Sequence, residues 1–266
     1  MAYCDVNGCN YYYEIIGQGE PLVMIRGLGS NADHWYPQLP VLSKHYRVLV
    51  FDNRGIARTS DMDGPYSIRG MADDTVGLMD AVGFEKAHIL GLSMGGMIAQ
   101  EIALNYPQRV KGLILGVTHC GGEKQVPPTE EITNIFNAMI QEGTDEAKRA
   151  AAAVLFAPET LEKRPELAAQ YAEVSLRQPV PAEILTKQRN AVQEFNTWDR
   201  LPQITAPTLI LGADQDVLIP SENSKILAER IPNAELVIVK GGGHQILIEQ
   251  SDACNQAVLS FLEKCI

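Results

Sequence analysis

The sequence lacks a stretch that could cross a membrane, since no apolar run in its 266 residues approaches the ~18 residues that a bilayer requires. The N-terminus shows no charged segment followed by an apolar stretch, the pattern of a secretory signal. Basic residues are few: 22 Lys and Arg stand against 33 Asp and Glu, a formal net charge of −11. Nucleic acids and anionic membrane surfaces are bound by basic patches, and we find none here. We therefore expect a cytoplasmic monomer or homodimer that binds neither nucleic acid nor membrane.

Cysteine pairs with redox or metal-binding spacing are missing as well. The five cysteines are odd in number and scattered, without a CxxC pair or a histidine at metal-ligand spacing. This pattern indicates free thiols and no metal site, and no organic cofactor is expected. Cys120 follows His119, but neighbours on an extended segment point to opposite faces, so packing is the favoured role of Cys120.

The hydrophobic content, in contrast, is high. With 45% hydrophobic residues, a chain of this length can bury a large core. Apolar runs such as PLVMI, YRVLVFD and VKGLILGVT alternate with amphipathic helical patterns, which implies a parallel sheet covered on both faces. A run over 9–16, with Asn7-Gly8 ahead of it, predicts a hairpin-like pair of strands. We predict an α/β protein with a mostly parallel, twisted sheet of about eight strands and helices on both faces.

The interval 123–199 interrupts this alternation. It contains no strand-like run and predicts several helices punctuated by prolines, over TEEITNIFNAMIQ, DEAKRAAAAVLF, PELAAQYAEVSL and AEILTKQRNAVQEF. It lies between two sheet strands, at the edge where loops after parallel strands line a site. We predict a core domain formed by 1–122 and 200–266, and a helical lid, or cap, over 123–199.

Most apolar residues of this lid are expected to form its own core. A minority should face the cleft and contact the substrate, because small-molecule sites are lined mainly by apolar side chains. Our candidates for this role are Phe136, Met139 and Trp198.

Residues 87–106 predict a nucleophile elbow, in which a strand turns sharply into a helix with Ser93 at the apex of GLSMG. Gly91 and Gly95 leave room two positions to either side, and Gly96 lets the helix lie close to the sheet. The first N–H groups of the helix favour negative charge at the same point. The alternative is a glycine-rich turn whose serine merely caps the helix.

A serine nucleophile needs a base, and the base needs an orienting acid. Among the five histidines, His244 follows the strand LVIVKGGG in a glycine-rich loop that can reach over a neighbouring strand end. The acid is expected at the end of the preceding strand, in GADQDVLIP, where Asp216 is the first choice and Asp214 the second. We predict Ser93, Asp216 and His244 as the catalytic residues.

A rival order, His45, Asp52 and Ser93, matches the order of the trypsin-like proteases. That order belongs to paired β-barrels, and the alternation of strands and helices argues against it. We expect Asp52 to hold a turn through Arg54 instead.

These motifs resemble the α/β-hydrolase fold enzymes over essentially the whole chain. The elbow GLSMG, the acid loop GADQDVLIP, the histidine loop GGGH and the turn FDNRGIARTS, similar to that family's DxRGxGxS, occur in the family's order, with a helical cap between the sixth and seventh strands. Within the family the chain is similar to small cofactor-free esterases, enol-lactonases and C–C bond hydrolases. The resemblance implies an oxyanion hole formed by the backbone N–H groups of Met94 and Leu28.

The sequence departs from the family at two positions. Arg26-Gly27 stands where the family has His-Gly, but a backbone donor survives a change of side chain. We expect Arg26 to pair with a buried carboxylate; the alternative is that it reaches into the cleft and selects an acidic substrate. Ala57 replaces the second glycine of DxRGxGxS, which should alter only the shape of the loop.

The leading hypothesis is a serine hydrolase that cleaves a small carboxylic ester or lactone through an acyl-enzyme. Cleavage of a C–C bond in a ring-opened diketone uses the same triad and remains an alternative. A third possibility, from a different class, is a non-catalytic receptor or scaffold that binds a small molecule and keeps the triad.

Overall fold

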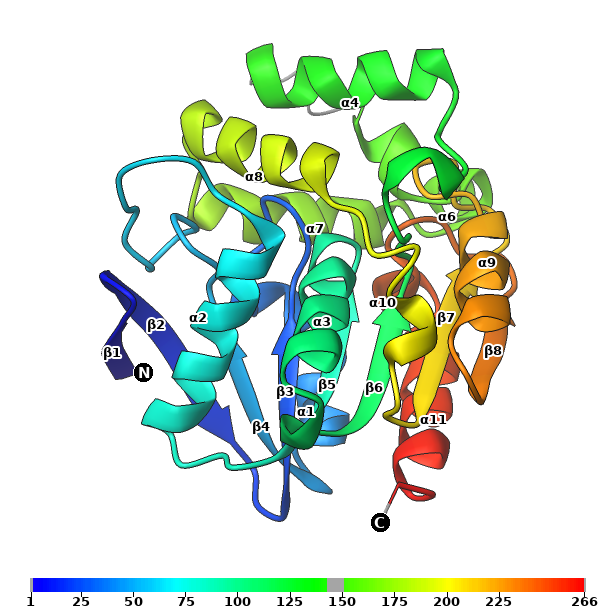
Figure 1. The fold of residues 1–266 in the computed structure, drawn as a ribbon. Coiled ribbons are helices and arrows are strands. Elements are labelled where there is room, and N and C mark those ends of the chain that lie inside the picture. The colour runs from blue at the N-terminus through cyan, green and yellow to red at the C-terminus, as the bar shows by residue number, and fades with distance from the viewer. Residues whose placement is uncertain (1, 143–150, 266) are drawn as a thin grey trace.

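The computed structural model describes residues 2–142 and 151–265 of the chain. A single twisted sheet of eight strands forms its centre, in the order β1-β2-β4-β3-β5-β6-β7-β8 (Figure 1). The strands are β1 (Ala2–Val6), β2 (Cys9–Ile16), β3 (Glu20–Ile25), β4 (Tyr46–Phe51), β5 (Ala87–Leu92), β6 (Val110–Gly116), β7 (Thr208–Ala213) and β8 (Ala234–Val239).

Most of the strand pairs are parallel, as the sequence predicts. Only β1 with β2 and β2 with β4 pair antiparallel; the other neighbours run parallel. The β1–β2 hairpin closes through Asn7 and Gly8, whose φ angles of 50° and 85° are the positive values that a tight hairpin turn requires. The predicted fold class is therefore confirmed.

The sheet separates two hydrophobic cores. Alternate residues of β3 point to opposite faces: Val23 and Ile25 belong to one core, and Leu22 and Met24 to the other. The first core is covered by α2 (Ile68–Ala81), α3 (Met94–Asn105) and α9 (Glu222–Arg230). The second is covered by α1 (Leu39–Leu42), α10 (Ile246–Glu249) and α11 (Ser251–Leu262). The short 3₁₀ helices are η1 (Ala32–Trp35), η2 (Pro107–Arg109), η3 (Gly122–Lys124) and η4 (Leu201–Gln203).

Helices fill the interval between β6 and β7 and lie over the carboxyl ends of the strands (Figure 1). They are α4 (Glu130–Glu142), α6 (Pro158–Lys163), α7 (Pro165–Arg177) and α8 (Ala182–Glu194). The predicted helix over 145–156 falls partly outside the described residues, and α6 has no counterpart among the sequence predictions. A bridge between Gly121 and Asn196 brings the two ends of the insertion together. No helix among the described residues is long and apolar enough to cross a membrane.

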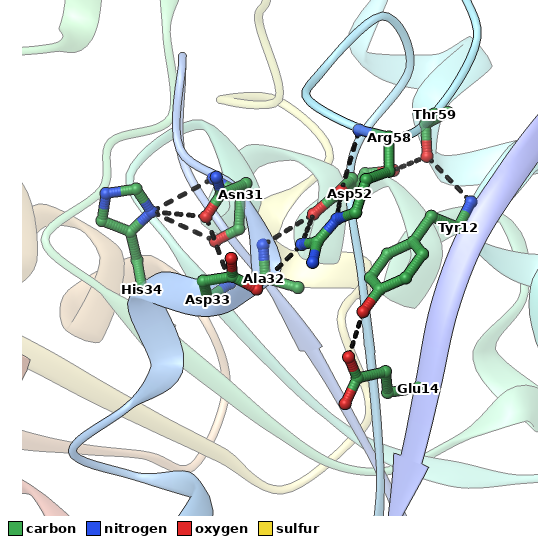
Figure 2. A network of polar contacts seen from close by, with 9 residues as sticks. All are labelled: Tyr12, Glu14, Asn31, Ala32, Asp33, His34, Asp52, Arg58 and Thr59. Carbon is green, nitrogen blue, oxygen red and sulfur yellow. Dashed lines mark hydrogen bonds and ion pairs between the residues drawn. The ribbon is translucent and has the colours of Figure 1, made fainter. Parts of the chain in front are cut away.

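The prediction that Asp52 pairs with Arg54 is wrong. The fully buried carboxylate of Asp52 accepts a hydrogen bond from Nε of Arg58 at 2.7 Å and one from the backbone N–H of Ala32 at 2.8 Å (Figure 2). Arg54 points toward α2 instead, where its Nε lies 2.9 Å from the carboxylate of Asp74. The loop folds Arg58 back over the end of β4, which ties the loops after β3 and β4 together.

The rival triad of His45, Asp52 and Ser93 is excluded because His45 and Asp52 lie at opposite ends of β4. His45 is exposed and precedes the first residue of β4, whereas Asp52 follows its last residue. A strand of six residues is about 20 Å long, so the two side chains lie at opposite edges of the sheet.

Candidate active site

Ser93 occupies a strained turn between β5 and α3. Its φ of 55° and ψ of −120° fall outside the conformations that a residue with a side chain adopts freely. The neighbouring glycines make the turn possible: a Cβ on Gly91 would lie 2.1 Å from the carbonyl oxygen of Gly95, and a Cβ on Gly95 would lie 2.1 Å from that of Ile25. Thr118, in the loop after β6, donates a hydrogen bond from its Oγ1 to the carbonyl oxygen of Ser93 at 2.8 Å, which stabilises the turn.

Three loops bring Ser93, His244 and Asp216 into one hydrogen-bonded chain. Nε2 of His244 lies 3.1 Å from Oγ of Ser93, and Nδ1 of His244 lies 2.8 Å from Oδ2 of Asp216. The other carboxylate oxygen of Asp216 accepts the backbone N–H groups of Leu218 and Ile219 at 2.9 and 2.8 Å. His244 and Asp216 are buried, while Ser93 is partly exposed. This is the arrangement of a serine nucleophile with its base and orienting acid.

Asp214, the second choice for the acid, lies elsewhere in the same loop. Its side chain is exposed, and it accepts the backbone N–H of Gly241 at 2.8 Å. It therefore shapes the turn at the start of the histidine loop and does not contact His244.

The two predicted oxyanion donors flank the nucleophile. Met94 is the first residue of α3, and Leu28 lies in the loop after β3. That loop approaches closely, because a Cβ on Gly27 would lie 3.0 Å from Cβ of Ser93. Among the described residues, no protein acceptor bonds to the N–H of Leu28 or Met94. Both groups are therefore free to donate to a substrate oxygen.

The loop after β3 is held from two sides by residues that the sequence did not single out. Nδ2 of Asn53 donates to the carbonyl oxygen of Arg26 at 3.0 Å. From the cap, the fully buried Gln188 of α8 accepts the N–H of Gly29 at 2.9 Å. The loop that carries the predicted donor Leu28 is thus held by a contact between the cap and the core.

Glu249 holds the histidine loop in a similar way. One oxygen of its buried carboxylate accepts the N–H of Gly243 and the other accepts the N–H of Ala157 in the cap, both at 2.8 Å. Burial raises the pKa of this carboxyl group. No local pattern in the sequence marks Glu249 or Gln188, since Ala157, one partner of Glu249, and Gly29, the partner of Gln188, lie far away along the chain.

The predicted substrate contacts in the cap have different surroundings. Phe136 and Met139 are half-buried on α4, which packs on α8. Trp198 stacks against Arg230, whose Cζ lies 4.3 Å from the ring centroid. One face of this indole is therefore occupied by α9, and a role in the cleft remains a prediction for all three.

Arg26 has no carboxylate partner within 4.0 Å in residues 2–142 and 151–265, so the expected buried ion pair is wrong. The side chain is 2% exposed; its Nη2 donates to Oε1 of Gln245 at 3.2 Å, and its Cζ lies 4.8 Å from the centroid of the Trp35 ring. The surroundings at this end of β3 are aromatic rings and an amide, which leave the positive charge uncompensated. Burial lowers the pKa of Arg26 to about 10, so the guanidinium stays protonated at neutral pH.

Cys120 is buried in the first hydrophobic core, and its Sγ donates a hydrogen bond to the carbonyl oxygen of the next residue, Gly121. Burial raises the pKa of the thiol, which disfavours a nucleophilic role. Within the described part of the chain, no group of three or more His, Cys, Asp or Glu side chains is arranged to hold a metal ion.

Three buried histidines predict a loss of stability in mild acid. Desolvation lowers the pKa of His34 to about 3 and those of His88 and His119 to about 4. Because each binds its proton more readily in the unfolded chain, stability is full above about pH 6.5 and is lost as the pH falls toward 4. Together they should lower the free energy of unfolding by up to about 5 kcal/mol between pH 7 and pH 5.

Urea denaturation at the two pH values measures this loss. His88→Gln removes one of the three groups and should reduce the pH-dependent loss by about a third. If the free energy of unfolding falls equally in the variant and the wild type, His88 has the same pKa in the folded and the unfolded protein.

Comparisons with known proteins agree with this geometry. Residues 20–251 match the family described as alpha/beta hydrolase fold. The protein named "Putative carbamate hydrolase RutD" of Azorhizobium caulinodans is 31% identical over 265 residues, 98% of either chain. The crystal structure of the enol-lactonase from Burkholderia xenovorans superposes with a TM-score of 0.89 at 27% identity, covering 98% of this chain and 100% of that one. The meta-cleavage product hydrolase of Pseudomonas fluorescens gives a TM-score of 0.83 at 29% identity, over 97% and 96% of the two chains.

Proposed function

Because this chain belongs to the α/β-hydrolase fold family, we propose that it is a serine hydrolase that cleaves a small carboxylic ester or lactone through an acyl-enzyme. The hydrogen-bonded chain from Ser93 through His244 to Asp216 is the observation that carries the proposal. The similarity to an enol-lactonase supports it further, since a lactone is a cyclic ester.

In the first step, Nε2 of His244 takes the proton of Ser93 as Oγ attacks the carbonyl carbon of the substrate. Asp216 keeps the proton of His244 on Nδ1 and stabilises the imidazolium that forms. The electron pair of the carbonyl double bond moves to its oxygen, which accepts hydrogen bonds from the N–H groups of Leu28 and Met94. The first N–H groups of α3 and its dipole add to this stabilisation.

The tetrahedral intermediate collapses to the acyl-enzyme when the bond to the leaving oxygen breaks and His244 protonates that oxygen. Water then attacks the acyl carbon, with His244 as its base, and the carboxylic acid leaves Ser93. No step requires a group other than these side chains, two backbone donors and water.

Two other substrates fit the same nucleophile. The name of the Azorhizobium relative favours a carbamate, in which a nitrogen replaces the carbon next to the carbonyl. The similarity to a meta-cleavage product hydrolase favours a C–C bond next to a ketone. Both reactions begin with an addition to a carbonyl group, so the substrate pocket and not the triad decides among them.

The experiment that tests this proposal combines labelling with turnover. A fluorophosphonate probe should label the wild type covalently with one probe molecule per protein molecule, and mass spectrometry should find the label on the peptide that contains Ser93. The wild type should also hydrolyse p-nitrophenyl esters, and the best acyl length in a series will size the pocket. A p-nitrophenyl carbamate and a ring-opened diketone are assayed alongside. A folded protein that is not labelled and turns over none of these substrates would instead be a non-catalytic binder.

A further inference from the structure

The buried guanidinium of Arg26 lacks the groups that normally compensate a charge inside a protein. Its Nε and Nη1 atoms are shielded from solvent and have no hydrogen-bond partner in residues 2–142 and 151–265. A buried charge without a partner costs several kcal/mol, because it loses its hydration and gains nothing in return. Its single bond to Gln245 and its contact with Trp35 leave most of its hydrogen-bonding capacity unused.

Other donors lie near this cation, and two of them have no partner among the described residues. The hydroxyl of Tyr36 and Nε1 of Trp35 are buried, and neither forms a hydrogen bond within the described part of the chain. The hydroxyl of Tyr171, on α7 of the cap, lies 3.3 Å from Oγ of Ser30, a single long hydrogen bond among the described residues. Tyr36 and Tyr171 pack in the same small cluster beneath the cap. Tyr36 directly follows Trp35, whose ring lies against the guanidinium of Arg26. A set of N–H and O–H donors around a positive charge is the chemistry that binds an anion.

The cluster lies beside the reaction centre. Arg26 directly precedes Gly27, whose backbone faces Ser93, and its guanidinium bonds to Gln245, which directly follows His244. It also lies at the carboxyl end of β3, where α/β proteins bind their ligands. An anion held here would be a second part of a molecule whose carbonyl group lies at Ser93.

We propose that Arg26, together with the hydroxyls of Tyr36 and Tyr171, binds a carboxylate carried by the substrate. The natural substrate is then an ester or lactone that also carries a free acid group. This site differs from the oxyanion hole, which holds the reacting carbonyl oxygen through backbone N–H groups. The inference rests on the proposed serine hydrolase function, and the experiment below distinguishes failure of the carboxylate site from failure of that function.

The test compares two esters of the same shape. Mono-p-nitrophenyl adipate ends in a carboxylate, and p-nitrophenyl 6-methylheptanoate carries an uncharged isopropyl group in its place. The wild type should give a kcat/KM at least about 10-fold higher for the adipate. In Arg26→Gln the ratio of the two kcat/KM values should fall by about 100-fold, the effect of losing a charge-assisted contact. Arg26→Lys keeps the charge and should restore part of the ratio.

Tyr36→Phe provides a variant that should fold like the wild type, since the hydroxyl it removes has no partner among the residues that the structure describes. It should lower the ratio by about five-fold, mainly through a higher KM for the adipate. The control is Arg177→Gln, on the exposed face of α7, which should leave the ratio unchanged. Equal losses on both esters in Arg26→Gln and Tyr36→Phe, or no preference in the wild type, would overturn the carboxylate site. If neither ester is cleaved in a Ser93-dependent way, the proposed function itself fails.

Discussion

Ser93→Ala should lower kcat/KM for p-nitrophenyl esters by about 10⁴-fold or more, because it removes the oxygen that forms the acyl-enzyme in the proposed mechanism. The residual rate would come from substrate binding and from the oxyanion donors, which the substitution leaves in place. Alanine at position 93 would have the same backbone strain as serine. The hydroxyl that the substitution removes forms a hydrogen bond with His244 among the described residues. The melting temperature should therefore change by only a few degrees.

The measurement is steady-state hydrolysis with circular dichroism as the check on folding. Ser43→Ala is a matched control, because Oγ of Ser43 bonds to the carbonyl oxygen of Leu39 in α1, away from the elbow. It should keep the wild-type rate. A folded Ser93→Ala protein with wild-type turnover would exclude an acyl-enzyme at this residue.

Asp216→Asn should lower kcat by about 10⁴-fold, which is the effect known for this change in serine proteases. The physical reason lies in the two N–H groups of Leu218 and Ile219, which Oδ1 of Asp216 accepts. The amide oxygen of asparagine would keep those bonds, so its NH₂ group would face Nδ1 of His244. His244 would then carry its proton on Nε2 and could not accept the proton of Ser93.

Asp214→Asn provides the matched control within the same loop. Its side-chain oxygen can still accept the N–H of Gly241, so both stability and kcat should stay within a few-fold of the wild type. Measuring kcat of Asp214→Asn and Asp216→Asn side by side decides which of the two carboxylates orients His244. An inactive Asp214→Asn with an active Asp216→Asn would reverse the assignment.

Hydrogen bonds between the cap and the core hold two loops of the candidate site, the loop after β3 and the histidine loop. Gln188 of α8 bonds to Gly29, and Glu249 joins Gly243 to Ala157. The loops that carry the predicted oxyanion donor Leu28 and the predicted base His244 are therefore held by side chains from outside those loops. We expect that the cap contributes to the catalytic geometry as well as to substrate selection.

The sequence by itself determined the features that depend on short-range sterics and periodicity. The turn at Ser93 could be predicted because Gly91 and Gly95 are the residues whose missing side chains allow it. The hairpin could be predicted because Asn7-Gly8 tolerates two positive φ angles, and the parallel sheet because its apolar runs need cover on both faces. The order of motifs also placed the serine, acid and histidine loops at one edge of the sheet.

Only the tertiary structure decided which side chains meet across those loops. Local sequence does not specify how a loop folds over its neighbours, and a hydrogen bond depends on shifts of less than 1 Å. Asp52 therefore binds Arg58 and not Arg54, and Asp216 reaches His244 while Asp214 turns outward. The same holds for Arg26, whose expected carboxylate is missing among the described residues because the elements packed around it supply aromatic rings and an amide.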